Sequence, residues 1–270
     1  MPGIFKTAKR LNALLSNFPK LRRKIDSIGV EYHLLQENFN YDMEQNGEKW
    51  LLQTLAKNNL LTKPVFDVGA NHGDWSAIVL GCNPTANIQC FEICPPTYEK
   101  LVCNPICKQG NVVFNQFGLA DAPGEIEINY FPGEDGLTTI YGELHQQKRQ
   151  SLKVKVDTGE KYCAENQITE ISLLKVDVEG AEHLVFKGFG PFLTPQKVPV
   201  IQFEYGQVNI LSKFLLRDFY QLFEARGYRI GKLFPAGVRF KDYSFEDEDF
   251  RGPNYIAAGP DMVGLLGEEA

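Results

Sequence analysis

The sequence lacks any hydrophobic run that approaches the roughly 20 residues of a membrane-spanning helix. It has no basic excess either: 28 Lys and Arg against 34 Asp and Glu give a net charge of −6, which disfavours non-specific binding to nucleic acid. Six cysteines in 270 residues are too few for a disulfide scaffold, and the first residues do not form a secretory signal. We therefore expect a reduced, soluble, cytoplasmic protein with no nucleic-acid partner and no transmembrane segment.

Acidic residues are absent from the first 25 positions, which hold seven basic residues, so residues 26–270 carry −13. Apolar residues recur at helical spacing through residue 28, and Pro19 predicts a break between two short helices. We expect residues 1–40 to form a basic amphipathic arm whose apolar stripe packs on the main domain as a cap. A membrane-surface or partner-binding role for residues 1–28, self-association and an organelle transit peptide are the alternatives.

Strand and helix patterns alternate from residue 41 to the end of the chain. The expected strands are residues 64–68, 86–91, 111–117, 171–176, 198–203, 228–234 and 254–258, and the clearest helices are 43–57 and 214–226. This alternation predicts one α/β domain, 41–270, with a parallel sheet covered by helices on both faces. At about 125–157 the pattern changes to period two, which indicates an antiparallel insertion around a glycine-rich loop at 132–143.

The strongest single motif is DVGANHG at 67–73, between an apolar strand and a helical pattern. Gly69 and Gly73 allow a tight turn that approaches a ligand closely, and the amides of the following helix start favour a polar or negative group. Glu92 ends the next strand, where a carboxylate can accept both hydrogen bonds of a ribose diol. Since the turn has no Lys, an ATP phosphate site is disfavoured. We predict a nucleoside site; the alternative is an ordinary turn with a surface Glu.

With these residues the chain resembles the FkbM-type S-adenosylmethionine-dependent methyltransferases. DVGANHG is similar to their first motif, FEICPP at 91–96 to their second segment with Ile93 and Cys94 as departures, and LLKVDVEGAEHLVFKGF at 173–189 to their most distinctive segment. VKVDT at 154–158 is similar to a shorter one. The resemblance covers residues 64–205. It implies a class I methyltransferase (Rossmann-like) fold, whose seven-stranded, mostly parallel sheet has an antiparallel last strand.

The resemblance also implies transfer of a methyl group to a hydroxyl of a sugar, glycolipid or natural-product scaffold. Carried over residue by residue, it implies contacts with S-adenosylmethionine. The turn residues Asp67, Gly69, Ala70, Asn71 and Gly73 would hold the methionine part, Glu92 and Ile93 the ribose side, Gly118 and Leu119 of FGLAD the adenine, and Asp177 would lie near the methyl group.

Carboxylates cluster after two of the expected strands. Asp177 ends strand 171–176, Glu179 and Glu182 follow it, and Glu204 ends strand 198–203. Neighbouring carboxylates raise each other's pKa unless a cation is near, and that cation is either the sulfonium or Mg²⁺. We expect Asp177, Glu179 and His145 to be catalytic and Glu182 and Glu204 to contact substrate; the metal requirement stays open. The alternative is that acids in a first helical turn only complement its dipole.

Two further motifs leave other hypotheses open. His72 and His183 are additional candidates for a general base. The pairs Cys90/Cys94 and Cys103/Cys107 have spacings that a structural zinc site admits, yet Cys90 falls inside an expected strand, so we expect free thiols. The rivals to an O-methyltransferase are a methyltransferase acting on another atom and a non-catalytic nucleoside-binding protein with a protein partner. A nicotinamide-dependent oxidoreductase is disfavoured because the third glycine of its fingerprint is missing.

Overall fold

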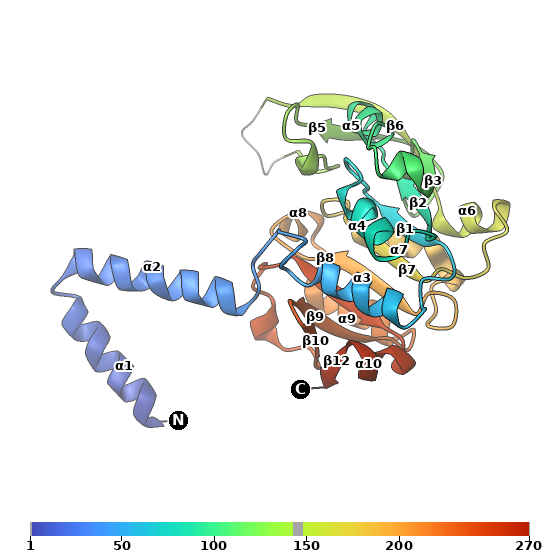
Figure 1. Ribbon diagram of the computed structural model, residues 1–270. Coiled ribbons are helices and arrows are strands. Elements are labelled where there is room, and N and C mark those ends of the chain that lie inside the picture. The colour runs from blue at the N-terminus through green and yellow to red at the C-terminus, as the bar shows by residue number, and fades with distance from the viewer. Residues whose placement is uncertain (1, 143–147, 270) are drawn as a thin grey trace.

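The computed structural model describes residues 2–142 and 148–269 (Figure 1). A central sheet runs in the order β12-β10-β9-β11-β8-β7-β1-β2-β3 among these residues. Its strands are β1 (Val65–Val68), β2 (Asn87–Phe91), β3 (Asn111–Asn115), β7 (Leu173–Val176), β8 (Val200–Glu204), β9 (Arg229–Phe234), β10 (Gly237–Phe240), β11 (Asn254–Ala258) and β12 (Gly267–Glu269).

The sheet confirms the predicted class I arrangement. Strands β3, β2, β1, β7 and β8 are parallel neighbours, and β11 is antiparallel to both β8 and β9. Because all five parallel strands point the same way, their carboxyl ends meet at one edge, where ligands bind in open α/β sheets. Two short strands that we did not predict, β10 and β12, extend the edge beyond β9.

Helices cover both faces of the sheet, as predicted (Figure 1). On one face lie α3 (Glu48–Lys57), α4 (Asp74–Cys82) and α10 (Pro260–Leu266), and on the other α6 (Gly159–Glu165), α7 (Glu182–Phe189) and α9 (Leu216–Glu224). Shorter helices are α5 (Pro95–Leu101) and α8 (Asn209–Ser212). Val65 packs in the hydrophobic core on the α3, α4 and α10 side of the sheet. Phe66 and Val68 pack in the core on the α6, α7 and α9 side. Apolar side chains on both faces explain why these strands are continuous hydrophobic runs.

A second, smaller sheet confirms the predicted antiparallel insertion. It has the order β4-β6-β5, with β4 (Gly118–Leu119), β5 (Gly124–Tyr130) and β6 (Gln150–Asp157). Strands β5 and β6 are antiparallel and place Ile126 opposite Val154. A short 3₁₀ turn, η2 (Asp135–Leu137), lies in the glycine-rich loop that follows β5. The insertion therefore brings a loop to the carboxyl-end side of the central sheet.

The amino-terminal arm forms two helices, α1 (Pro2–Leu15) and α2 (Pro19–Gln36), with the break at Pro19 that the sequence predicts. Our expectation that its apolar stripe caps the main domain is wrong: Leu14, Leu21 and Ile28 are at least half exposed, and the arm projects from the body (Figure 1). The reason is that both faces of the sheet are already covered by other helices. No helix among the described residues is long and apolar enough to cross a bilayer.

Candidate active site

The turn from β1 to α4 requires glycine. Gly69 and Gly73 have φ angles of +80° and +83°, which L side chains rarely adopt. A Cβ on Gly69 would lie 1.8 Å from the carbonyl oxygen of Asp177. The backbone of the turn therefore presses directly against the end of β7, and this close approach joins the two predicted parts of the site.

Glu92 connects the same turn to the end of β2. Its side chain is buried, and its Oε2 accepts a hydrogen bond from the amide of Asn71 (2.9 Å) while Oε1 accepts one from the amide of Cys94 (2.8 Å). Burial raises the pKa of Glu92 to about 7, against the two amide hydrogen bonds, which lower it. The carboxylate that the sequence singled out thus lies under the glycine turn at the carboxyl edge of the sheet.

A buried ion pair that we did not predict supports the turn from below. Asp67 is fully buried, and its carboxylate accepts hydrogen bonds from Ser76 Oγ (2.7 Å) and Lys175 Nζ (3.1 Å). The same ammonium group donates to the carbonyl of Gly69 (3.2 Å) and lies 3.4 Å from Asp177 Oδ2. Burial lowers the pKa of Lys175, but Asp67 and Asp177 more than offset this and hold it above its usual value. The feature of the sequence that could have revealed this ion pair was a single Lys inside an otherwise apolar strand.

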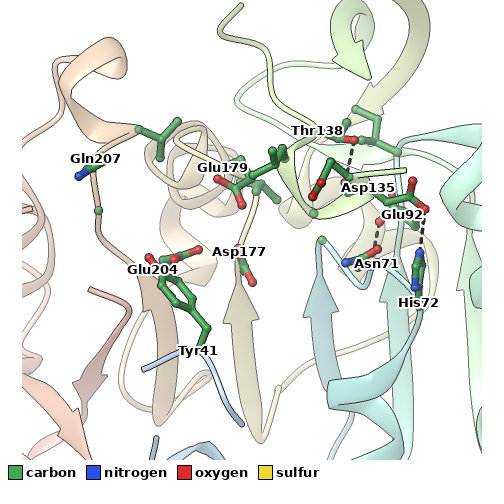
Figure 2. Close-up of a pocket in the computed structure, with 18 of the residues that line it drawn as sticks. Tyr41, Asn71, His72, Glu92, Asp135, Thr138, Asp177, Glu179, Glu204 and Gln207 are labelled. Atoms are coloured by element: carbon green, nitrogen blue, oxygen red, sulfur yellow. Dashed lines mark hydrogen bonds and ion pairs between the residues drawn. The ribbon is translucent and has the colours of Figure 1, made fainter. Parts of the chain in front are cut away.

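A cavity of about 750 Å³ opens at the carboxyl ends of β1, β2, β7 and β8 (Figure 2). It brings together many residues predicted from the sequence. Those lining it are Gly69, Asn71, Glu92, Ile93, Asp177, Glu179 and Glu204. A smaller apolar pocket of about 60 Å³ adjoins it and is lined by the predicted Ile93, Gly118 and Leu119, among others.

Within residues 2–142 and 148–269, four residues predicted to contact cofactor or substrate do not line either space: Asp67, Ala70, Gly73 and Glu182. Glu182 is fully buried, and its Oε1 accepts hydrogen bonds from the amides of Val178 (3.0 Å) and Gly180 (3.1 Å). Burial raises the pKa of Glu182 to about 7. This carboxylate therefore shapes the loop between β7 and α7 from behind, and a direct contact with substrate stays a prediction.

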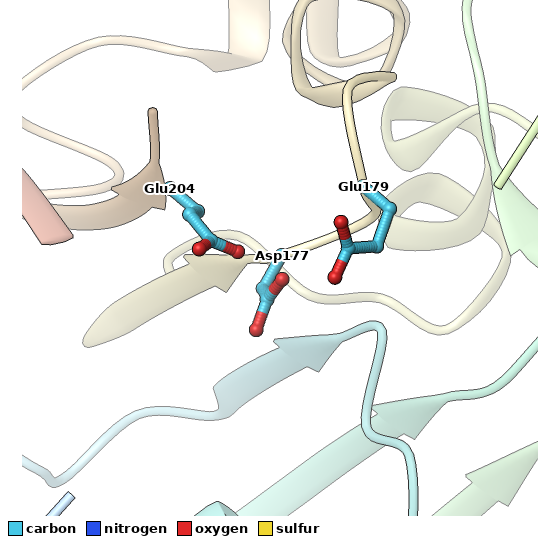
Figure 3. Close-up of side chains that lie close together, drawn as sticks. All are labelled: Asp177, Glu179 and Glu204. Atoms are coloured by element: carbon cyan, nitrogen blue, oxygen red, sulfur yellow. The ribbon is translucent and has the colours of Figure 1, made fainter. Parts of the chain in front are cut away.

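Three carboxylates meet at one end of the cavity (Figure 3). Each of Asp177, Glu179 and Glu204 offers an oxygen, and the three oxygens lie within 4.8 Å of one another. Burial, followed by repulsion from the neighbouring carboxylates, raises the pKa of Glu179 and of Glu204 well above the usual range. The same two influences raise the pKa of Tyr41, which faces them, to about 12. This end of the cavity therefore favours a cation.

The two described histidine candidates, His72 and His183, lie in different parts of the structure. His72 lines the cavity, and its Nε2 lies 2.8 Å from Oδ2 of Asp135 in η2, which also pairs with the ammonium group of Lys100. Nothing in the sequence singled out Asp135. His183 instead stacks on Phe214, with ring centroids 4.8 Å apart. His145 lies outside the described residues, so its role stays a prediction.

All six cysteines are free thiols. Cys90, Cys94 and Cys107 are buried, and burial raises the pKa of Cys90 above its usual range. A buried thiol with a raised pKa is protonated at neutral pH and is a poor nucleophile. The Sγ of Cys90 lies 3.2 Å from the hydroxyl of Ser76, within the packing around Asp67.

Comparison with known proteins finds relatives that are methyltransferases by name. "Hexuronic acid methyltransferase AglP" of Haloferax volcanii is 26% identical over 163 residues, which cover 60% of this chain and 63% of the relative. "Methyltransferase sdnD" of Sordaria araneosa is 31% identical over 160 residues, covering 48% of this chain and 62% of the relative. The chain thus spans less than two thirds of the length of either relative.

Among solved structures, the plantazolicin methyltransferase BpumL in complex with SAH is 10% identical, with a TM-score of 0.40 over 84% of this chain and 90% of that one. The profile described as "Methyltransferase FkbM domain" matches residues 66–230, which is more than half of the chain. The matched range contains the glycine turn, Glu92 and the carboxylates that follow β7 and β8. The chain belongs to the methyltransferase FkbM domain family.

Proposed function

We propose that the protein is an S-adenosylmethionine-dependent O-methyltransferase whose acceptor is a hydroxyl of a sugar, glycolipid or natural-product scaffold. One observation carries the proposal: a single cavity joins the Glu92-supported turn to the carboxylate cluster of Asp177, Glu179 and Glu204. A relative named for methylation of hexuronic acid supports a sugar as the first acceptor class to test.

The nucleoside half of the cavity has a suitable hydrogen-bond acceptor and a suitable shape. Each oxygen of Glu92 accepts one amide hydrogen bond, and a carboxylate has about four lone-pair sites, so capacity remains for a ribose diol. Beside it, Ile93 packs so closely on Gly118 that a Cβ there would lie 2.5 Å from Cδ1 of Ile93. A larger side chain at position 118 would displace the end of Ile93, and the apolar wall of this pocket suits a flat ring such as adenine.

The other half has suitable charge. S-adenosylmethionine carries a sulfonium and an ammonium group, and the cluster of three carboxylates is destabilised in its fully charged form by burial and mutual repulsion. A cation among them removes that penalty. Because oxygen donors also suit Mg²⁺, the same cluster is compatible with a metal-assisted reaction.

The reaction is an in-line displacement in which the bound cofactor supplies a methyl group on a good leaving group. Orientation of the acceptor by the cavity walls can supply up to about 7–11 kcal/mol of the barrier. The acceptor hydroxyl must also lose its proton. With a cation beside them Glu179 and Glu204 are charged, so either can accept that proton at a carboxylate oxygen, and such a base contributes about 10²–10⁴-fold. Asp177, the third carboxylate of the cluster, lies 3.4 Å from the ammonium group of Lys175.

The test begins with calorimetry, using S-adenosylhomocysteine and the full chain. We expect the titration to show binding at a single site, and we expect the Glu92→Ala variant to bind the ligand more weakly. Uronic-acid glycans are then incubated with isotopically labelled S-adenosylmethionine, and mass spectrometry locates the added methyl group. Absence of binding contradicts the cofactor assignment. Binding without transfer to any hydroxyl contradicts the O-methyltransferase assignment and favours a binding protein or another acceptor atom.

A further inference from the structure

Helix α2 carries a row of apolar side chains that no part of the protein covers among the described residues. Leu21, Ile25, Ile28, Tyr32 and Leu35 recur at helical spacing and are 40–76% exposed. None of the described residues of α2 is buried. An amphipathic helix whose apolar face stays in water is unusual for a globular protein, since that face is normally packed.

Basic side chains lie directly beside the beginning of this row. Lys20, Arg22, Arg23 and Lys24 are all exposed, and α1 adds three more basic residues. Residues 26–270 carry −13, so the arm is a cationic, apolar projection from an acidic body. Its charge is therefore complementary to an anionic surface, and the length of α2, about 27 Å by the rise of an 18-residue helix, lets the whole row lie in one plane.

Two other occupants of the row fit less well. Outside the arm, the exposed large apolar residues of the described surface are Tyr41, Ile106, Val113, Ile210 and Phe245. They lie in separate segments of the chain, so they form no continuous stripe to receive the helix. Two α2 helices could pair as a coiled coil only over the 18 residues of the helix. That length is less than the three to four heptads that a stable coiled coil needs. We propose that α1 and α2 dock the protein on an anionic lipid surface, with the apolar row at the headgroup–acyl boundary and the basic residues at lipid phosphates.

The connection from α2 to the body gives this docking a consequence. Glu37 pairs with Lys232 (3.2 Å), and the side-chain Nδ2 of Asn38 donates to the carbonyl of Leu233 (2.9 Å), so the chain is fixed immediately after the helix. The next residues, Phe39 and Tyr41, line the cavity. A docked arm thus brings the cavity wall within a few residues of the lipid. That a lipid-linked acceptor is presented there rests on the proposed function; the docking itself does not.

The experiment measures sedimentation of the full chain with vesicles of phosphatidylcholine alone and of phosphatidylcholine mixed with phosphatidylserine. We expect binding to the mixed vesicles only, and its loss at high salt. Replacement of Arg22, Arg23 and Lys24 by Gln lowers the affinity by about a hundredfold. The triple change Leu21→Ser, Ile25→Ser and Ile28→Ser abolishes binding. The matched control is Gln at the exposed Lys108, Lys153 and Lys155 of the body, which leaves binding unchanged.

Circular dichroism and S-adenosylhomocysteine binding verify that each variant is folded, and neither needs methyl transfer. Equal binding to both vesicle types, or no binding to either, overturns the proposal. So does a light-scattering result in which the row forms a dimer that excludes vesicles. If the vesicles bind but no acceptor is ever methylated, the docking stands and only the proposed function fails.

Discussion

The buried carboxylate of Glu92 has two roles. It accepts hydrogen bonds from the amides of Asn71 and Cys94, and it is the predicted ribose ligand. Glu92→Ala removes hydrogen bonds to a charged group, so we expect S-adenosylhomocysteine affinity to fall by about tenfold to a hundredfold. Calorimetry measures this, and Glu125→Ala, an exposed Glu on β5, is the control. Wild-type affinity in a folded Glu92→Ala variant would remove the ribose assignment.

The carboxylates after β7 carry the predicted chemistry. Asp177→Asn combined with Glu179→Gln keeps the side-chain shapes and removes two charges, so turnover should fall by about a hundredfold or more while S-adenosylhomocysteine still binds through Glu92. EDTA separates the roles: loss of wild-type turnover restored by Mg²⁺ identifies metal ligands, and turnover unaffected by EDTA identifies a base or a charge effect. Near wild-type turnover of the double variant would place the chemistry elsewhere, with Glu204 and His145 the next candidates.

The raised pKa values predict the pH dependence of binding. Glu92 has a pKa of about 7, so it gains a proton and loses acceptor capacity as pH falls through neutrality, and both S-adenosylmethionine and S-adenosylhomocysteine bind more weakly. Glu179 and Glu204 add a further effect for S-adenosylmethionine alone, because its sulfonium favours their charged forms and releases protons. Calorimetry in buffers of different ionisation enthalpy counts these protons. Equal proton release by the two ligands would contradict a sulfonium beside this cluster.

At the scale of the elements, the β1–α4 turn depends on backbone conformation. Gly69→Ala introduces a Cβ 1.8 Å from the carbonyl oxygen of Asp177 at a positive φ, so we expect the free energy of unfolding to fall by about 2 kcal/mol or more. Gly81→Ala is the control: it lies in α4 with nothing within 4 Å, and Ala should stabilise this helix by up to about 1 kcal/mol. Urea unfolding measures both. Similar effects of the two changes would contradict the role of the turn.

Element boundaries were predicted well where burial is continuous and less well at exposed ends. Strand β11 has the predicted bounds, 254–258, because it is buried from Tyr255 to Ala258. Helix α3 begins at Glu48, five residues later than expected, since Gly47 has a φ of +107° and the chain before it forms turns. Strands β10 and β12 were missed because each is short, with four and three residues.

For the molecule as a whole, we expect the arm and the body, residues 41–270, to be separable. Truncation that begins the chain at Gly29 removes α1 and the basic half of α2 but keeps Glu37, Asn38 and every residue that lines the cavity. We expect S-adenosylhomocysteine affinity to be unchanged, since the nucleoside half is built from residue 67 onward, while binding to anionic vesicles is lost. A truncated chain that folds but no longer binds the ligand would contradict this separation.

The sequence by itself determined seven strands of the central sheet, the family, and which glycines and carboxylates lie at the ligand edge, because a turn at the end of a buried parallel strand is a local feature. Only the tertiary structure decided which of them share a cavity. Lys175 donates a hydrogen bond to the buried carboxylate of Asp67 below the turn. Glu182 accepts hydrogen bonds from amides of the loop after β7, and Asp135 of the insertion contacts His72. It also left the apolar row of the arm uncovered. These outcomes depend on contacts between residues far apart in the chain, which hydrophobic periodicity does not encode.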